Sequence, residues 1–375
     1  MMPINHHLDP LERSGIRVFT NLAKATPDCR MLTIGEPDQA TPEPIRQAAL
    51  EALSRGETHY APNQGTASLR SAIAAFETNR GRPTAPEEVL VTVGATQALY
   101  TALTGILNPG DQVIIPTPAF SLYATIVTAA GAEPVFLDVS KTDFQITEEA
   151  LNACLTEKTK AIVLNSPCNP TGVILRESSL DTVARAVLGR EIYLICDNVY
   201  DKLVYAPCGD LTRREDLRPQ TILCQSFSKP YAMTGWRVGY LLADLPVKRE
   251  LEKVHQYCVV SAASTSQRAC CAALGCDPSP MREVYRRRRD FALQRLDEID
   301  LPVCKPEGAF YLFPSIEAFG MDSATFCTRM IHEAGLAATP GFCFGSDRHI
   351  RLTYCYDDEQ LAEGLNRLER FVRSL

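Results

Sequence analysis

Between residues 89 and 243 the chain alternates short apolar runs with amphipathic segments, and this alternation constrains the fold more than any other feature. The apolar runs are VLVTV (89–93), QVIIP (112–116), PVFLD (134–138), KAIVLN (160–165), EIYLIC (191–196), TILCQS (221–226) and RVGYLL (237–242). Between them, the segment 178–188 places Leu180, Val183, Val187 and Leu188 on one face of a helix. The pattern predicts an α/β fold, a three-layer α/β/α domain with a mostly parallel sheet.

Two proline-rich breaks, at 35–45 and 276–280, bracket this body. After the second break, the strand patterns GAFYLF (308–313) and HIRLTY (349–354) alternate with helical ones, which indicates a smaller α/β domain. The predicted division is an N-terminal arm and part of the small domain over 1–44, a large domain over 45–277, and a small C-terminal domain over 278–375.

Composition narrows the class of protein. The net charge is −7 and no basic run is sustained, which argues against a nucleic-acid partner. No apolar stretch is long enough to cross a membrane, and no secretory signal is visible at the N-terminus. The 14 cysteines lack zinc-ligand or C-x-x-C spacing, so no metal site is expected. Free thiols in a reducing cytoplasm are the simplest interpretation.

The segment SFSKPYAMTGWRVGY (226–240) places Lys229 directly after a predicted core strand. Lysine is usually solvated, so this position calls for a chemical reason. One hypothesis is a Schiff base with pyridoxal phosphate (PLP), whose phosphate Ser226 and Arg237 would hold. Taken alone, the segment also fits a surface lysine or the S-x-x-K motif of serine β-lactamases, but the companion motifs S-D-N and K-T-G are absent.

Further polar candidates follow other predicted strands. Gly94, Ala95 and Thr96 open a helix after 89–93, where free N–H groups could bind phosphate, although a plain helix cap has the same pattern. Asp197 follows 191–196 and fits either a helix cap or a carboxylate that keeps the pyridine nitrogen of PLP protonated.

The loops after 112–116 and 160–165 carry weaker signals. Phe120 and Tyr123 fit core aromatics as well as a platform for a cofactor. Asn169, in SPCNPTG, fits an amide that reaches a ring hydroxyl and a simple turn equally well.

Taken together, these residues resemble the class I aminotransferases of PLP fold type I. The matching motifs are GATQAL (94–99), NPTG (169–172), CDNVY (196–200), SFSK with Arg237 eight residues on, and HIRLTY (349–354). Their order and spacing agree from about residue 15 to the end. The resemblance implies the fold type I architecture and PLP as the cofactor.

The resemblance also implies a cofactor-binding role for each matching position. Lys229 would carry PLP and act as the general base, and Asp197 would pair with the pyridine nitrogen. Asn169 and Tyr200 would hydrogen-bond the ring oxygen, and Phe120 would stack on the ring. The helix start at Gly94, with Ala95, Thr96, Ser226 and Arg237, would hold the phosphate.

Substrate and partner contacts follow from the same resemblance. Arg351 matches the arginine that binds the substrate α-carboxylate, with Gly35 and Asn169 beside it. Tyr60 matches the tyrosine that reaches the phosphate of the neighbouring subunit, which implies a homodimer with shared active sites. Asn198 departs from the family, in which glutamate commonly follows the aspartate.

The expected reaction is ping-pong transfer of an amino group between an L-amino acid and a 2-oxo acid. Four segments (14–23, 32–38, 253–267 and 306–321) are similar to bacterial N-acetyl-LL-diaminopimelate aminotransferases, with 2-oxoglutarate as the expected acceptor. An aspartate or aromatic aminotransferase, a PLP-dependent C–S β-lyase and a PLP-binding regulatory domain are the alternatives. Arg17 and Lys24 are among the candidates for the substrate's distal anion.

Overall fold

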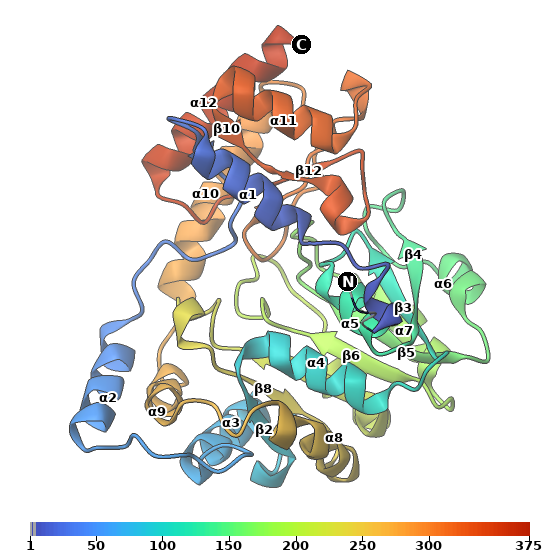
Figure 1. Ribbon diagram of the computed structural model, residues 1–375, viewed down its shortest axis with the longest axis vertical. Coiled ribbons are helices and arrows are strands. Elements are labelled where there is room, and N and C mark those ends of the chain that lie inside the picture. The colour runs from blue at the N-terminus through green and yellow to red at the C-terminus, as the bar shows by residue number, and fades with distance from the viewer. Residues whose placement is uncertain (1, 3–4) are drawn as a thin grey trace.

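A computed structural model describes Met2 and residues 5–375 (Figure 1). Its centre is a seven-stranded sheet in the order β2-β8-β7-β6-β5-β3-β4. The strands are β2 (Val89–Thr92), β3 (Gln112–Thr117), β4 (Glu133–Asp138), β5 (Thr159–Asn165), β6 (Tyr193–Asp197), β7 (Thr221–Ser226) and β8 (Gly239–Leu242). Neighbouring strands run parallel except at β8, which is antiparallel to both β2 and β7.

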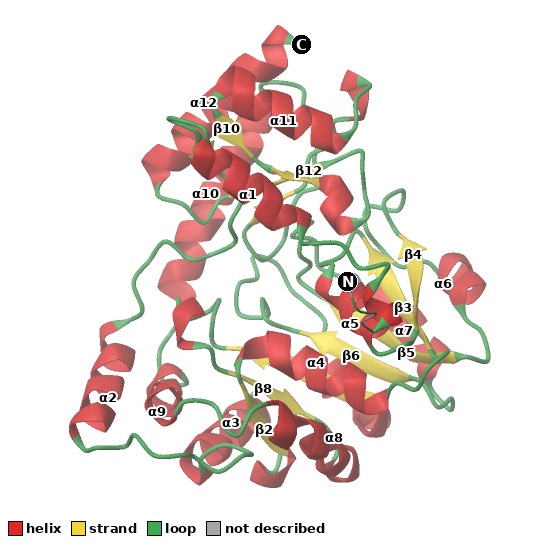
Figure 2. Ribbon diagram, viewed as in Figure 1, coloured by secondary structure: helices red, strands yellow, loops and turns green. Residues whose placement is uncertain are grey.

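Helices cover both faces of this sheet (Figure 2). One face carries α4 (Gly94–Ile106), α5 (Leu122–Ala129) and α8 (Leu245–Cys258), and the other carries α3 (Ala67–Asn79), α6 (Glu148–Cys154), α7 (Glu177–Val187) and α9 (Ser264–Ala273). Alternate residues of β5 enter the two cores, Ile162 on one side and Val163 on the other. The expected three-layer α/β/α architecture is therefore confirmed.

One detail of the amphipathic helix differs from expectation. Leu180, Val183 and Val187 are buried on α7, but the helix ends at Val187. Leu188 is the C-cap, with extended backbone, and its side chain is 49% exposed. The prediction is therefore wrong for Leu188, because the helix ends one residue before it.

The second, smaller body joins both ends of the chain. Its elements are α1 (Gly15–Ala25), β1 (Arg30–Met31), α10 (Ser279–Asp297), β9 (Tyr311–Leu312), α11 (Ser323–Ala334), β10 (Leu336–Ala337), β11 (Thr339–Pro340), β12 (Ile350–Thr353) and α12 (Asp358–Ser374). β1 pairs in parallel with β10, and Phe19 and Leu32 share a core with Phe326 and Leu365. Residues from the N-terminal segment thus complete the C-terminal body.

The predicted domain limits fall close to element starts. The helix α2 (Glu43–Ser54) packs on α9 of the large body, and α10 begins at Ser279, within the break at 276–280. We keep the division 1–44, 45–277 and 278–375 as a proposal; residues 1, 3 and 4 lie outside the described residues. Short 3-10 helices complete the chain: η1 (His6–Leu8), η2 (Pro86–Glu88), η3 (Leu211–Arg213), η4 (Glu215–Gln220), η5 (Thr234–Trp236), η6 (Glu317–Phe319) and η7 (Gly341–Phe344).

Two further properties concern the whole described chain. The 14 cysteines are free thiols. Within the part of the chain that the structure describes, no helix has the length and apolar character needed to span a membrane.

Candidate active site

A cavity of about 310 Å³ lies at the carboxyl ends of β5, β6 and β7, where residues of the small body face the large one. A ligand site at this edge is expected of a parallel sheet. The residues predicted from sequence that line it are Gly35, Ala95, Thr96, Phe120, Asn169, Asp197, Tyr200, Ser226, Lys229, Arg237 and Arg351.

Two predicted residues do not line this cavity. Gly94 lies directly behind it, since a Cβ atom at this position would stand 2.7 Å from Nη2 of Arg237. Tyr60 is 87% exposed on the surface of the single chain. A role for Tyr60 at a cofactor therefore requires a second copy of the chain.

Lys229 follows the end of β7 and reaches across to the small body. Its Nζ donates a hydrogen bond to the carbonyl oxygen of Gly35 at 2.5 Å, and it forms no salt bridge with any carboxylate that the structure describes. Burial lowers the pKa of the Lys229 amine to about 8. A pKa near 8 leaves roughly a tenth of the amine neutral at pH 7. The neutral amine is the form that a nucleophile or general base requires.

Asp197 ends β6, and its side chain is almost fully buried. The hydroxyl of Tyr123 donates to Oδ2 at 2.6 Å, and the amide of Val199 donates to Oδ1 at 3.4 Å. Burial raises the pKa of the Asp197 carboxyl to about 6, because these neutral donors compensate only in part. Among the residues described, none forms an ion pair with it, so a cationic ligand group would satisfy this site.

The start of α4 forms a cradle with the side chains of Ser226, the last residue of β7, and Arg237, from the β7–β8 connection. Gly94 has a φ of 73° and places the first turn of α4 against Arg237, whose backbone is also left-handed. Nη1 of Arg237 donates to the Thr234 carbonyl at 2.9 Å, and Ser226 lines the same wall. Free helix N–H groups, a hydroxyl and a guanidinium without a carboxylate partner in the described chain suit a phosphate.

Arg351 lies on β12 and is 3% exposed. Its Nη1 donates to Oδ1 of Asn169 at 2.9 Å, and its Nη2 donates to the Thr33 carbonyl at 2.6 Å. The guanidinium lies between the rings of Tyr311 and Phe344, 4.7 and 4.8 Å from their centroids. Nε has no hydrogen-bond partner within the described residues. Because its acceptors are neutral, its full charge is available to a ligand carboxylate.

Sequence reasoning missed three contributors to this site. Asn165 ends β5, donates to the Asp197 carbonyl and accepts from the Asn169 amide, each at 2.8 Å, so it ties two predicted residues together. The Thr33 carbonyl is a backbone group that no residue type reveals.

Tyr311 hydrogen-bonds Tyr200. The signal available in the sequence was a hydroxyl-bearing residue inside the apolar run GAFYLF. Tyr123, left open between core and platform, is a buried core residue whose hydroxyl also holds Asp197.

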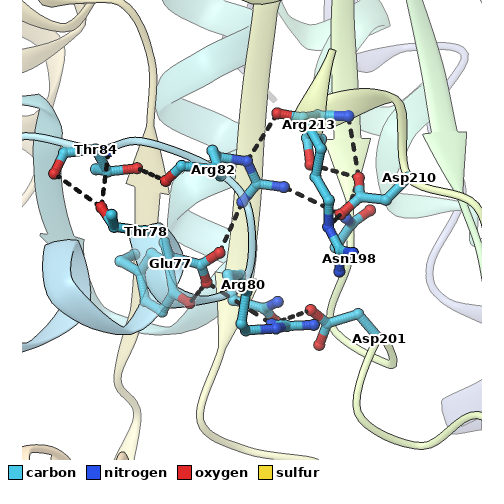
Figure 3. Close-up of polar contacts among 12 residues, drawn as sticks. Glu77, Thr78, Arg80, Arg82, Thr84, Asn198, Asp201, Asp210 and Arg213 are labelled. Carbon is cyan, nitrogen blue, oxygen red and sulfur yellow. Dashed lines mark hydrogen bonds and ion pairs between the residues drawn. The ribbon is translucent and has the colours of Figure 1, made fainter. Parts of the chain in front are cut away.

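A network of buried and half-buried ion pairs lies beside the turn 198–201 (Figure 3). Arg80 donates to Asp201 at 2.7 Å, while Arg82 donates to Glu77 at 2.9 Å and to Asp210 at 3.1 Å. Asn198 donates to the other oxygen of Asp210 at 3.3 Å. The network thus fixes both ends of the turn 198–201, which carries Tyr200 into the cavity.

The side chain of Asn198, the position that departs from the family pattern, belongs to this network. Its side chain points toward Asp210 in the network (Figure 3), and it does not line the cavity.

The fold and the residues at this cavity define an aminotransferase. The family model for aminotransferase class I and II matches residues 27–368, so the chain belongs to this family. A probable N-acetyl-LL-diaminopimelate aminotransferase of Bacillus subtilis is 40% identical over 98% of this chain and 96% of its own length. An aspartate aminotransferase of Pyrococcus abyssi is 37% identical over 99% of both chains.

Solved structures agree with this assignment. The aspartate aminotransferase from Thermus thermophilus with maleate superposes with a TM-score of 0.94 at 33% identity, covering 99% of this chain and 100% of the other. The aspartate aminotransferase from Thermotoga maritima gives a TM-score of 0.95 with the same identity and coverage. The protein is therefore an aminotransferase, an enzyme that acts on amino acids and 2-oxo acids.

Proposed function

We propose that this aminotransferase uses PLP bound at Lys229 and transfers amino groups by a ping-pong mechanism. The observation that carries the proposal is a set of three ionisable groups without counter-charges around one cavity, Lys229, Asp197 and Arg351. They match the three groups that the reaction presents: the cofactor aldehyde, the pyridine nitrogen and the substrate α-carboxylate. The cradle at Gly94 and Arg237 matches the phosphate.

Each of these residues has a separate role in the proposed reaction. Arg351 binds the α-carboxylate and orients the Cα–H bond toward Lys229. The Lys229 amine, which donates to the Gly35 carbonyl in this structure, would hold the cofactor and, once the substrate's amino group has displaced it, would move the α-proton. Asp197, held by Tyr123, would face the ring nitrogen and favour its protonated form. When bound, PLP supplies the electron sink for the negative charge that develops at the α-carbon.

We further propose a homodimer in which Tyr60 contacts the phosphate in the other subunit. Tyr60, Tyr257 and Val260 are 87%, 88% and 57% exposed. The Asn63 side chain donates to the carbonyls of Val259 and Val260, which holds the Tyr60 loop beside Tyr257 and Val260. An exposed patch of this kind suits an interface. Sedimentation velocity should give a dimer, and Val260→Asp should weaken it; a monomeric wild-type protein would refute this part.

For the substrate, we propose N-acetyl-LL-diaminopimelate as donor and 2-oxoglutarate as acceptor, supported by the 40% identity to the Bacillus subtilis relative. The aspartate and aromatic alternatives stay open because relatives with those names are also similar. Arg17 and Lys24 are exposed on α1 and do not line the cavity, whereas their neighbour Ile16 does. The free cysteines favour a cytoplasmic enzyme.

A spectral screen of amino donors against the PLP-loaded protein tests the proposal. Rapid loss of the visible cofactor absorbance with N-acetyl-LL-diaminopimelate, but slow loss with aspartate and tyrosine, is expected. Pyruvate and thiol released from cystathionine would instead identify a C–S β-lyase. Cofactor binding without conversion of any donor would favour the regulatory alternative.

A further inference from the structure

The pair Tyr200 and Tyr311 joins the two sides of the cavity through a single hydrogen bond. Their hydroxyl oxygens lie 2.6 Å apart, and their side chains are 4% and 2% exposed. Within the described residues, neither hydroxyl has another hydrogen-bond partner. Tyr200 comes from the turn after β6 in the large body, whereas Tyr311 lies on β9 of the small body.

The position of Tyr311 depends on its neighbours. A Cβ atom at Gly35 would lie 2.2 Å from the Tyr311 hydroxyl oxygen, so the glycine makes room for it. On the other side, the Tyr311 ring lies against the guanidinium of Arg351. The ring and the hydroxyl of Tyr311 thus make separate contacts, one toward the carboxylate-binding arginine and one toward Tyr200.

The number of protons available decides the direction of the hydrogen bond between Tyr200 and Tyr311. A tyrosine hydroxyl has one proton to donate. If Tyr200 donates its proton to the ring oxygen of a bound cofactor, its oxygen can only accept from Tyr311. A hydroxyl that accepts one hydrogen bond becomes a better donor of the next. The groups that influence Tyr311 are Arg351, Tyr200, Cys355 and Asp197, and burial raises the pKa of its hydroxyl to about 12, so it keeps its proton.

We propose that Tyr311 is a positioning residue, whose hydroxyl turns the Tyr200 proton toward the cofactor ring oxygen and whose ring supports Arg351. This inference rests on the proposed PLP function and assigns the two halves of one side chain to two different ligands. It therefore predicts that removing the hydroxyl alone affects the cofactor, while removing the ring also affects the substrate.

The experiment measures PLP binding to the cofactor-free protein by absorbance, and separately kcat and KM for an amino donor. Tyr311→Phe should weaken PLP binding about 3- to 10-fold, the range for one buried hydrogen bond, and shift the visible absorbance. KM for the donor should change less than about twofold, because the ring remains under Arg351. Tyr311→Leu should weaken PLP binding similarly and raise KM as well.

A double-mutant cycle with Tyr200→Phe makes the test specific. In that background Tyr311→Phe should cause no further loss of PLP affinity, because the hydroxyl has nothing left to orient. The matched control is Tyr354→Phe, a fully buried tyrosine whose hydroxyl donates to the Ala309 carbonyl at 3.3 Å and which does not line the cavity. It should lower stability and leave PLP affinity and absorbance unchanged.

Three outcomes would overturn the inference: an unchanged PLP affinity in Tyr311→Phe, additive losses in the cycle, or an equal effect in Tyr354→Phe. Should Tyr311→Phe fail to fold by circular dichroism, Gly35→Ala tests the same contact, because its methyl group would displace the Tyr311 hydroxyl. A wild-type protein that binds no PLP would instead refute the proposed function, so the two failures are distinguishable.

Discussion

The ion-pair network of Figure 3 and the charged groups of the cavity differ in how their buried charges are compensated. In the network of Figure 3, each buried charge has an opposite partner, as Arg82 has Glu77 and Asp210. In the cavity, Asp197 and Arg351 are equally buried but contact only neutral groups of the described chain.

The difference separates structural charges from charges that await a ligand. An unpaired buried charge costs several kcal/mol, and a fold tolerates it where binding later supplies the partner. Burial by itself therefore does not mark a functional residue; burial without compensation does. The following experiments challenge this distinction, beginning with the largest expected effect.

Lys229→Ala should abolish transamination, a loss of at least ~10³-fold, because it removes both the covalent attachment and the general base. The visible cofactor absorbance should disappear while a folded dimer remains. The matched control is Lys248→Met, another buried lysine, whose ammonium group pairs with Glu252 at 2.9 Å. That variant should lose stability and keep its activity. Retained activity in Lys229→Ala would refute the proposed role.

Arg82→Met should lower the free energy of unfolding by about 3–5 kcal/mol, because the buried Glu77 carboxylate loses its nearest cation and the half-buried Asp210 carboxylate loses one of its two arginine partners. Urea denaturation measures the effect. Arg185→Met is the control: its pair with Glu148 is largely exposed, so little change is expected. An equal effect of both variants would contradict the contrast between buried and exposed pairs.

Asp197→Asn and Asp201→Asn should respond to pH with opposite signs in the cofactor-free protein. The pKa of Asp197 is raised to about 6, so between about pH 4 and 6 the unfolded chain releases its proton first, and stability falls as pH rises. Asp197→Asn removes this loss and should gain about 3 kcal/mol relative to wild type between about pH 4 and pH 7.

For Asp201, burial opposes ionisation, but Lys202 and Arg80 prevail and lower its pKa. Its contribution is present above the unfolded-state pKa and is lost in acid. Asp201→Asn should therefore be most destabilising near neutral pH. Urea denaturation across this pH range measures both variants; parallel pH profiles would show that the two carboxylates do not differ as described.

Arg351→Met should lower kcat/KM for the amino donor by roughly 30- to 150-fold, equivalent to about 2–3 kcal/mol, because the α-carboxylate loses a charged fork. PLP affinity should change by less than about threefold. Arg351→Lys restores the positive charge but not the two-point contact with the carboxylate, so its kcat/KM should lie between those of wild type and Arg351→Met. Comparable losses of donor and PLP binding would argue against a substrate role.

The charged groups of the cavity could largely be predicted from the sequence. The alternation of strands and helices places Asp197 and Lys229 at the same sheet edge, because parallel strands end together. Motif spacing then identifies Asn169, Arg237 and Arg351. These are patterns of neighbouring residues, so they can be recognised without the structure.

The rest depends on tertiary contacts that leave no local pattern. The segment ETNRGRPT resembles a solvated helix end, yet Glu77 and Arg82 are buried once residues 210–212 pack over them. Tyr311 is hidden in an apolar strand pattern, and its partner Tyr200 lies 111 positions earlier. The proposed role of Tyr60 rests on the family resemblance alone, because its side chain is exposed in the single chain.

The reversal of β8 has a mechanical consequence. Because β8 runs antiparallel to β7, with Ser226 opposite Gly239, the connection 227–238 leaves and re-enters the sheet at the same edge. Lys229 and Arg237 therefore lie on one connection that is fixed to the sheet at both ends. Arg351 and Tyr311 lie on strands of the other, smaller body. A hinge motion between the bodies would change the distance from Arg351 to Lys229, while leaving the spacing of Lys229 and Arg237, the two proposed cofactor contacts, unchanged.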